Sequence, residues 1–470
     1  MYDVIVIGAG PAGSNAALET SAHGLNTLLI DEQRDAGGQV WRVKSKSILS
    51  APKTETSEKG DALRTNVKNS KVEVLFSARV WQIEKNEDDN WVLGVDSDIG
   101  SQTLCCKSLI IATGAQERVI PVPGWTLPGV LGLAGATALF KEHMMVPDRR
   151  VIVAGSGPLL FFVASEVIRL GGKVSAVVSI NSRFDWLKSL PAMMSNPSLI
   201  WQGVKWIIDL RMKRVPIHWG FGVKSIEGKD KVDGVTIGNI DSEWRLGAGK
   251  ERYIHGENVF YGHGLTPAIE ATRLAGADHH YDEALGGWVP TIDQLGRTSV
   301  KNLYACGDNA GILGVGAAPL RGQFAAMATL EDHGVNNIKK AELKQLKNAK
   351  KFGIAATALT IPRSGLEGFI TGETEVCRCE GVTRDEIEHE LKTGAASPNS
   401  VKSGTRCGMG PCGGRFCAES VAIITEFTNQ QSREEIGLPT SRPPLRPIAI
   451  NDISDDLNYD DLPIPGVSPL

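Results

Sequence analysis

The first thirty-two residues contain the pattern that most constrains the fold of this chain. Residues 3–8, DVIVIG, form a short β-branched run that predicts a buried parallel strand. The run leads into the turn GAGPAG, a helical stretch SNAALETSAHG and a second apolar run, NTLLID, which ends at Asp31 with Glu32 next. A strand, G-x-G-x-x-G, a helix, a second strand and a distal acid in this order predict a βαβ unit that binds a dinucleotide.

Each glycine of this turn is expected to have its own role. Gly8 makes the tight turn, Gly10 lets the backbone approach a pyrophosphate, and Gly13 lets the helix pack close to the strand. The N-terminus of the helix offers free N–H groups and the positive end of its dipole to the phosphates. Asp31 lies eighteen residues after Gly13, where a carboxylate can accept the ribose hydroxyls.

Residues 151–178 repeat the strand, turn, helix and strand of the first unit, so the sequence predicts two dinucleotide-type domains. The repeat is imperfect, because Leu160 stands where the third glycine of GSGPLL should be and Val178 replaces the ribose acid. We therefore expect a second domain that keeps the fold and does not bind NAD(P). In the alternative, Ser182 and Arg183 hold the 2′-phosphate of NADPH, and the chain is a self-sufficient NAD(P)H-dependent reductase.

Three later motifs are AGGQVWR (36–42), IIATGA (110–115) and TSVKNLYACGDNAG (298–311). Together with the first fingerprint they resemble the two-dinucleotide-binding flavoprotein reductases, which include glutathione and thioredoxin reductases. The resemblance implies that the first site binds FAD and that Asp308 hydrogen-bonds the ribityl chain and the flavin phosphate. The expected FAD-binding residues are Gly8, Gly10, Pro11, Ala12, Gly13, Asp31, Glu32, Gly37, Gly38, Gln39, Val80, Ala112, Thr113, Gly114, Gly307 and Asp308.

The disulfide reductases of that family carry a redox-active cysteine pair near the flavin. Here Cys105 and Cys106 are adjacent in a predicted strand and cannot take that part, so disulfide reduction is not expected. Cys306, within YACGD, is expected to be a small buried apolar side chain.

A cluster near the C-terminus has the spacing of metal ligands: Cys377-x-Cys379 and, after a gap of twenty-seven residues, Cys407-x4-Cys412. Four thiolates are the ligand set of a [2Fe–2S] cluster. The alternative is zinc, although structural zinc sites usually use C-x2-C knuckles. Between the two pairs, GVTRDEIEHELKTG predicts a helix that Thr383 caps, with Glu386 completing a capping box. Cys417 lies outside the pattern and is expected to be a buried neighbour.

The segments VCRCEGVT and TRCGMGPCGGRFC resemble the bacterioferritin-associated-ferredoxin (BFD) type of [2Fe–2S] domain. Behind a two-dinucleotide flavoprotein, and with GWTLPGVLGLAGATALFK (124–141) and RPPLRP (442–447), they resemble the α (A-type) subunits of heteromeric amine and opine dehydrogenases. That family includes opine oxidases, hydrogen cyanide synthase and dye-linked proline or hydroxyproline dehydrogenases. The likeness covers nearly the whole chain, with a departure at Gly413, where many members have a larger residue.

This resemblance implies an electron-transfer role. In the family a glycine-oxidase-like β subunit with its own FAD oxidises an amino acid or opine-like secondary amine. The α chain holds FAD and the [2Fe–2S] cluster and passes the electrons to an acceptor. Such complexes can also contain FMN at an interface between the chains, together with a small γ subunit. No catalytic residue is therefore expected in this chain. A third interpretation, a non-catalytic assembly or iron-handling protein, is disfavoured by the intact FAD motifs.

The composition limits the partners and the compartment. The net charge of -4 makes nucleic acid an unexpected partner. Neither a membrane span nor a signal peptide is expected, since the sequence lacks a long uncharged apolar run and a basic n-region. Half of the eight cysteines fall in the C-terminal ligand pattern, which indicates a reducing compartment. We expect a cytoplasmic protein, or one peripheral to the inner membrane through its partners.

The sequence as a whole predicts an α/β protein with two Rossmann-like domains of the glutathione-reductase type and a small helical iron–sulfur module. The expected FAD domain comprises residues 1–118 and 255–340, interrupted by the second dinucleotide domain, 119–254. A linker with small helices over 341–371, the iron–sulfur module over 372–420 and a C-terminal tail over 421–470, extended from residue 438, would follow.

Overall fold

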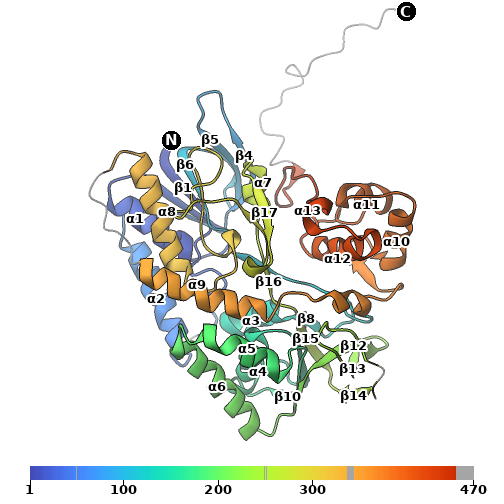
Figure 1. Ribbon diagram of the computed structural model, residues 1–470. Coiled ribbons are helices and arrows are strands. Elements are labelled where there is room, and N and C mark those ends of the chain that lie inside the picture. The colour runs from blue at the N-terminus through green and yellow to red at the C-terminus, as the bar shows by residue number, and fades with distance from the viewer. Residues whose placement is uncertain (49, 248, 250, 336–342, 451–470) are drawn as a thin grey trace, which may run out of the picture.

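The computed structural model describes residues 1–450 apart from 49, 248, 250 and 336–342. Two mostly parallel sheets with flanking helices form the bulk of this part of the chain, and a helical module follows them (Figure 1). The predicted α/β class with two Rossmann-like domains and a C-terminal helical module is therefore confirmed. The Asp-rich end of the expected tail, 451–470, lies outside the described residues.

The first sheet has the order β3-β2-β1-β6-β5-β4, with β19 also pairing with β6. Its centre is β1, whose Val4, Ile5 and Val6 are fully buried and pair in parallel with β2 on one side and β6 on the other. Strand β6 belongs to both the antiparallel and the parallel part of this sheet. Its start pairs antiparallel with β5, and its end pairs in parallel with β1 and β19. The strands are β1 (Tyr2–Ile7), β2 (Thr27–Asp31), β3 (Glu73–Phe76), β4 (Arg79–Lys85), β5 (Trp91–Ser97), β6 (Gly100–Ile111) and β19 (Leu303–Ala305).

The second sheet has the order β11-β10-β9-β15-β8, and all of its pairs are parallel. The strands are β8 (Val130–Gly132), β9 (Arg150–Gly155), β10 (Lys173–Ser179), β11 (Ile217–Trp219) and β15 (Asn258–Gly262). The boundary that we expected at residue 255 would assign β15 to the FAD domain. Its pairing with β9 instead places it in the second sheet, so the chain crosses back only after Gly262.

Smaller sheets complete the strand structure. A three-stranded antiparallel sheet lies at the end of the second domain, and two-stranded ribbons join or cover the larger sheets. These strands are β12 (Phe221–Gly228), β13 (Val232–Asn239) and β14 (Arg252–His255), and the pairs β7 (Ala115–Glu117) with β16 (Leu265–Pro267), β17 (His279–Asp282) with β18 (Gly287–Pro290), and β20 (Glu375–Cys377) with β21 (Val382–Thr383).

The helices follow the two domains and the module. Around the first sheet lie α1 (Pro11–Ala22), α2 (Glu55–Lys68), α7 (Glu270–Leu274) and α8 (Ala318–Asp332), and with the second sheet belong α3 (Leu133–His143), α4 (Pro158–Arg169), α5 (Arg183–Met193) and α6 (Pro197–Met212). The expected linker with helices contains α9 (Leu343–Ala358) and a 3-10 helix, η3 (Ser364–Phe369). Figure 1 shows α9 running between α8 and α5, so this helix joins the two domains.

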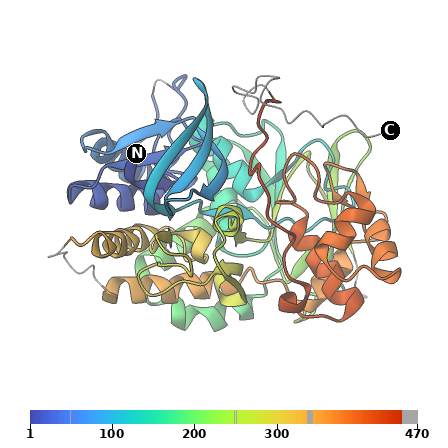
Figure 2. The same ribbon diagram turned by 90° about the horizontal axis from the view of Figure 1, so that it is seen from above.

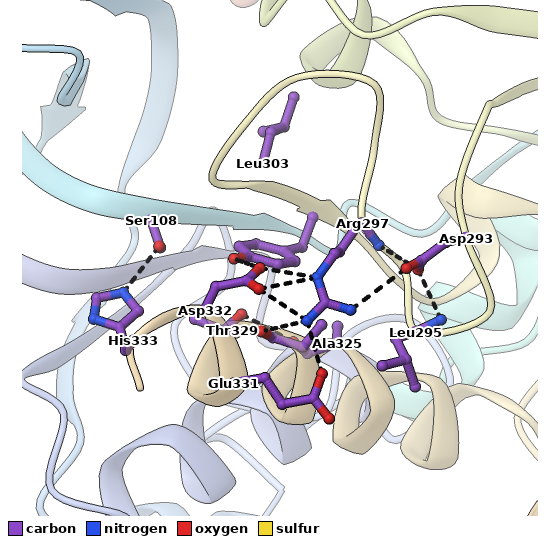
Figure 3. A network of polar contacts seen from close by, with 12 residues as sticks. Ser108, Asp293, Leu295, Arg297, Leu303, Ala325, Thr329, Glu331, Asp332 and His333 are labelled. Carbon is purple, nitrogen blue, oxygen red and sulfur yellow. Dashed lines mark hydrogen bonds and ion pairs between the residues drawn. The ribbon is translucent and has the colours of Figure 1, made fainter. Parts of the chain in front are cut away.

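A polar network fastens β19 to the end of α8 (Figure 3). The Arg297 guanidinium donates to Asp332 Oδ2 at 2.9 Å and to Glu331 Oε2 at 2.8 Å. Tyr304 Oη, on β19, donates to the same Asp332 oxygen at 2.6 Å. The segment expected to contact the flavin follows β19 directly, so this network holds its starting point in place.

The C-terminal module consists of α10 (Arg384–Lys392), α11 (Pro398–Thr405), α12 (Ala418–Asn429) and α13 (Arg433–Ile436). The capping box of Thr383 and Glu386 at the start of α10 is confirmed. The expected module boundary at residue 420 is wrong, because α12 and α13 continue the module to Ile436. Seen from above, the module lies to one side of both dinucleotide domains and contacts them (Figure 2).

Among the described residues, no helix has the length and apolar character needed to cross a membrane.

Candidate cofactor sites

The turn after β1 is packed tightly except at one glycine. Gly8 has a φ of +103°, and a Cβ there would lie 2.3 Å from the carbonyl oxygen of Ala112. A Cβ on Gly13 would lie 1.8 Å from the carbonyl oxygen of Gly8. A Cβ on Gly10, by contrast, would meet only Gly38 Cα, at 4.0 Å, among the described atoms. The backbone at Gly10 is therefore open to a ligand, as an approaching pyrophosphate requires.

The N-terminus of α1 opens beside Gly10. Gly10 is the N-cap residue, and no side chain caps the helix, so the first N–H groups remain available to an anion. The loop 36–39 lies against this end, since Gly37 N donates to Ala9 O at 2.8 Å and Gly38 contacts Gly10.

Asp31 and Glu32, at the end of β2, differ in their hydrogen-bond partners and in their exposure. Asp31 is tied to the turn, because its Oδ2 accepts from Ala9 N at 2.5 Å and its Oδ1 accepts from Gln33 N at 2.7 Å. Burial raises the pKa of Asp31, and these two N–H groups oppose that rise. Glu32 is exposed, and its Oε1 accepts from Arg446 Nε at 2.6 Å.

Asp308 is held in place by two backbone hydrogen bonds. Its Oδ1 accepts from the backbone N–H groups of Leu313 and Gly314, both at 3.0 Å. Burial raises the pKa of the Asp308 carboxyl. Just before it, Gly307 lies against α1, since a Cβ there would be 2.9 Å from Ala12 Cβ.

Arg321 stabilises this segment from α8. Its buried guanidinium donates to the carbonyl oxygens of Gly307 at 2.7 Å, Ala310 at 2.7 Å and Gly311 at 2.9 Å. Sequence reasoning missed this residue, because nothing in the pattern APLRGQF distinguishes it from a surface arginine.

Four segments distant in the sequence thus meet at the first site: the start of α1, residues 36–39, residues 112–114 and residues 307–308. Most of the expected FAD-binding residues lie in them. Val80 does not, because its side chain is buried in the core beneath the sheet, on β4. Gln39 is exposed, and its Oε1 accepts from Arg42 Nη1 at 2.6 Å.

The second fingerprint has the same crowded first glycine. Gly155 has a φ of +138°, and a Cβ there would lie 1.7 Å from Gly262 O. Leu160, at the position of the third glycine, is fully buried in the core of the second domain. Val178, at the position of the ribose acid, is also buried and offers no acceptor.

At the middle glycine the two fingerprints differ. Gly157 corresponds to Gly10, yet a Cβ on Gly157 would lie 2.4 Å from Thr360 Cγ2. Thr360 also lies against Gly264, and the carbonyl oxygen of Thr360 accepts a hydrogen bond from Arg118 Nη1 at 2.7 Å. The segment that follows α9 therefore fills the space that a pyrophosphate would need.

Asn181 holds this segment against the fingerprint. Its Oδ1 accepts from Gly157 N at 3.0 Å, and its Nδ2 donates to Leu359 O at 2.8 Å. The two residues proposed as a 2′-phosphate site are not arranged for one. The Ser182 hydroxyl caps α5 and donates to Asp185, and Arg183 is exposed at the first position of α5.

All five cysteines of the C-terminal module converge. The Sγ atoms of Cys377, Cys407 and Cys417 lie within 4.8 Å of one another, and all three residues are buried. Cys379 is exposed and lies beside Cys412. Cys417, which we expected to lie outside the ligand set, is thus as close to Cys377 as a ligand would be. A signal for it exists in the sequence, because Cys412-x4-Cys417 repeats the spacing of Cys407-x4-Cys412.

The donor set fits an iron–sulfur cluster better than it fits free thiols. The neighbouring Cys417 thiol and burial raise the pKa of Cys377, and burial and Cys412 raise the pKa of Cys379. Thiolates packed this closely repel one another, and bound cations remove that repulsion. Four thiolates would hold the two irons, two on each.

The module is fastened to the strand that leaves the flavin site. Ser420 Oγ, on α12, donates to Val119 O at 2.9 Å, and Glu419 lies 3.6 Å from both Arg118 and Arg433. Val119 is five residues after Gly114, so the chain between them spans at most about 18 Å.

Residues 2–353 match the pyridine nucleotide-disulphide oxidoreductase family, and residues 375–426 match the BFD-like [2Fe-2S] binding domain. These matches confirm the FAD and [2Fe–2S] cofactors expected from the sequence.

Curated relatives match along nearly the full length. The A-type subunit of opine oxidase from Rhizobium meliloti is 31% identical, covering 96% of this chain and 87% of the relative. The HcnB subunit of hydrogen cyanide synthase from Pseudomonas protegens is 30% identical, covering 94% and 96% respectively.

Solved structures agree on the fold. L-proline dehydrogenase from P. horikoshii superposes with a TM-score of 0.71 at 21% identity, covering 96% of this chain and 79% of that chain. Thioredoxin reductase from T. acidophilum superposes with a TM-score of 0.52 at 22% identity, covering 71% and 98%. The first match, at 96% of this chain, includes the C-terminal module.

Proposed function

The chain belongs to the pyridine nucleotide-disulphide oxidoreductase family and carries a BFD-like [2Fe-2S] binding domain behind it, and from this premise we propose its place in a larger enzyme. It is the flavin and iron–sulfur electron-transfer subunit of a heteromeric dehydrogenase that oxidises an amino acid or an opine-like secondary amine. A glycine-oxidase-like partner subunit with its own FAD carries out the oxidation. The names of the relatives, which describe each of them as one subunit of its enzyme, support a complex of this kind.

The contrast between Gly10 and Gly157 carries the proposal. The first fingerprint is open at its middle glycine, whereas Thr360 lies on the second. A nicotinamide nucleotide therefore has no pyrophosphate site at the second fingerprint, and electrons need another source. An amine-oxidising partner is the source that the relatives suggest.

We assign FAD to the first site and the cluster to the C-terminal thiols. FAD accepts two electrons together and releases them singly, and a [2Fe–2S] cluster carries one. The α1 N-terminus would bind the pyrophosphate, Asp31 the ribose and Asp308 the ribityl side of the flavin. The cluster ligands are Cys377, Cys379, Cys412 and a fourth thiol, from Cys407 or Cys417. FMN at an interface between the chains and a small γ subunit would complete the complex.

The chain itself limits the distance between the two cofactors. The turn 112–114 lies at the flavin site, β7 leads from it to Val119, and α12 is hydrogen-bonded there through Ser420. Ser420 is three residues after Cys417. We assign residues 1–118 and 263–340 to the FAD domain, 119–262 to the second domain and 372–437 to the iron–sulfur module. We place the protein in the cytoplasm, where thiols stay reduced.

Anaerobic visible spectra of the purified chain test the proposal. NADH and NADPH are expected to leave the spectrum unchanged, and dithionite, as the positive control, to bleach the flavin and iron–sulfur bands. Addition of a secondary-amine amino acid should bleach the bands only when the co-expressed partner subunit is present. Rapid bleaching by NADPH alone would instead identify a self-sufficient reductase.

A further inference from the structure

The cysteine cluster contains one thiol more than a [2Fe–2S] centre uses. Such a centre takes two thiolates on each iron. Cys379 and Cys412 lie together at the exposed side, which suits one iron. The other side offers three thiols, those of Cys377, Cys407 and Cys417, whose Sγ atoms all lie within 4.8 Å of one another.

Cys407 and Cys417 are equivalent by several measures. Each is separated from Cys412 by four residues, Cys407 before it and Cys417 after it. Each is nearly inaccessible, with 5% and 2% of its surface exposed. Each also stands at the end of a helix that holds it in place. Cys407 follows α11 after Arg406, which has a φ of +64°, and Cys417 is the N-cap residue of α12.

The glycines between them let both thiols approach the same point. Gly408 and Gly414 face each other, since a Cβ on either would lie 3.7 Å from the Cα of the other. A Cβ on Gly408 would also lie 3.9 Å from Cys417 Sγ. The two turns therefore lie in contact, and the φ values of +86° at Gly408 and +82° at Gly414 favour glycine at both positions.

We propose that Cys407 and Cys417 are alternative ligands for one coordination position of the cluster, so that the centre survives the loss of either thiol. The exchange needs no oxidant or reductant. One iron–thiolate bond breaks as the other forms, and the incoming thiol gives its proton to the departing thiolate. The inference rests on the presence of a [2Fe–2S] centre and is independent of what the partner oxidises.

Alanine variants of the full-length chain test the idea, because alanine removes the donor atom entirely. Iron and acid-labile sulfide per chain are measured, with the EPR spectrum after dithionite reduction and the FAD content as a check of folding. C407A and C417A are each expected to keep most of their iron and sulfide and to differ in g-values. The C407A/C417A double variant should contain roughly tenfold less iron per chain than the wild type, or less still. C105A, outside the module, is the matched control.

Two results would overturn the proposal. If either single variant loses its cluster while FAD stays bound, that thiol is an obligatory ligand and the position is not shared. If the double variant keeps its cluster, neither thiol is a ligand. Where a single alanine variant also loses FAD, the corresponding valine variant, which is closer in size to cysteine and also lacks a donor atom, replaces it in the same comparison. None of these outcomes depends on amine oxidation, so the proposed function is tested separately.

Discussion

Glu117 is a carboxyl group that the backbone surrounds closely. A Cβ on Gly132 would lie 2.0 Å from its Oε2, and a Cβ on Gly262 would lie 2.5 Å from its Oε1. Its Oε1 accepts a hydrogen bond from Ala134 N, at 3.0 Å, in the first turn of α3. Burial raises the pKa of Glu117 to about 7, although the backbone N–H groups at the start of α3 oppose the rise. The group is therefore easier to protonate in the folded chain than in the unfolded one.

This shift predicts a pH dependence of stability. The stabilising contribution of Glu117 is fully present below its usual pKa and is lost as the pH rises through about 7. Relative to E117Q, the free energy of unfolding of the wild type should fall by roughly 3 kcal/mol between pH 4.5 and pH 8. Chemical denaturation at several pH values measures it, with the exposed E87Q as control. Parallel profiles for the wild type and E117Q would contradict the prediction.

At the scale of elements, α9 and the turn after it close the second domain. Leu359 is buried and packs with Met193 of α5 and Ala355 of α9. Arg363 pairs with Asp185 at 2.6 Å, beyond the turn. The end of α9 and the turn after it thus cover the second fingerprint, and the contacts of Leu359 and Arg363 hold this turn on both sides of Thr360.

The Asn181 side chain joins the turn after α9 to the second fingerprint by hydrogen bonds, and removing this side chain should weaken that attachment. N181A leaves Gly157 N and Leu359 O without their partner, both in buried surroundings, which should lower the free energy of unfolding by about 1–3 kcal/mol. Hydrogen exchange should accelerate at the end of α9. N399A, whose amide bonds the exposed Thr440, is the control and should change stability by less than about 0.5 kcal/mol. Unchanged exchange in N181A would show that packing alone holds the segment.

At the scale of the whole molecule, the iron–sulfur module is attached through a buried charge cluster as well as through apolar contacts. Arg118 and Arg433 are 2% and 7% exposed, and Glu419 lies between them at 3.6 Å from each. Trp125 Nε1 adds a hydrogen bond to Glu375 O at 2.7 Å. The module is therefore docked on the dinucleotide domains and is not a freely tethered carrier.

Removing the charge of Glu419 should loosen this docking. In E419Q two buried guanidinium groups lose the carboxylate that they share, which should cost about 3 kcal/mol. Limited proteolysis should then cut near residues 371–374, before the module, at a higher rate. E426Q removes a more exposed partner of Arg433 and should cost less than about 1 kcal/mol. Equal effects of the two variants would mean that the buried cluster does not hold the module.

Much of this protein could be predicted from local patterns. The repeated strand, glycine turn and helix identified two dinucleotide folds. Strand burial, helix starts and crowded glycines such as Gly8 can be predicted because they depend on residues close together in the sequence. The family, the FAD and [2Fe–2S] cofactors and the capping box at Thr383 were likewise predictable. The individual FAD-binding residues, apart from their placement, stay predictions.

Three features depended on contacts between distant segments. Pairing alone placed β15 in the second sheet and so moved the domain boundary. Thr360 lies on Gly157 about two hundred residues away, and no local pattern marks a threonine for that position. The Sγ atom of Cys417 lies close to that of Cys377 because of the way the start of α12 packs in the module. The x4 spacing alone fits Cys407 with Cys412 and Cys412 with Cys417 equally well. The sequence by itself determined which folds and cofactors are present, since these depend on neighbouring residues. Only the tertiary structure decided which nucleotide site is open and which thiols meet, since these depend on where the chain returns.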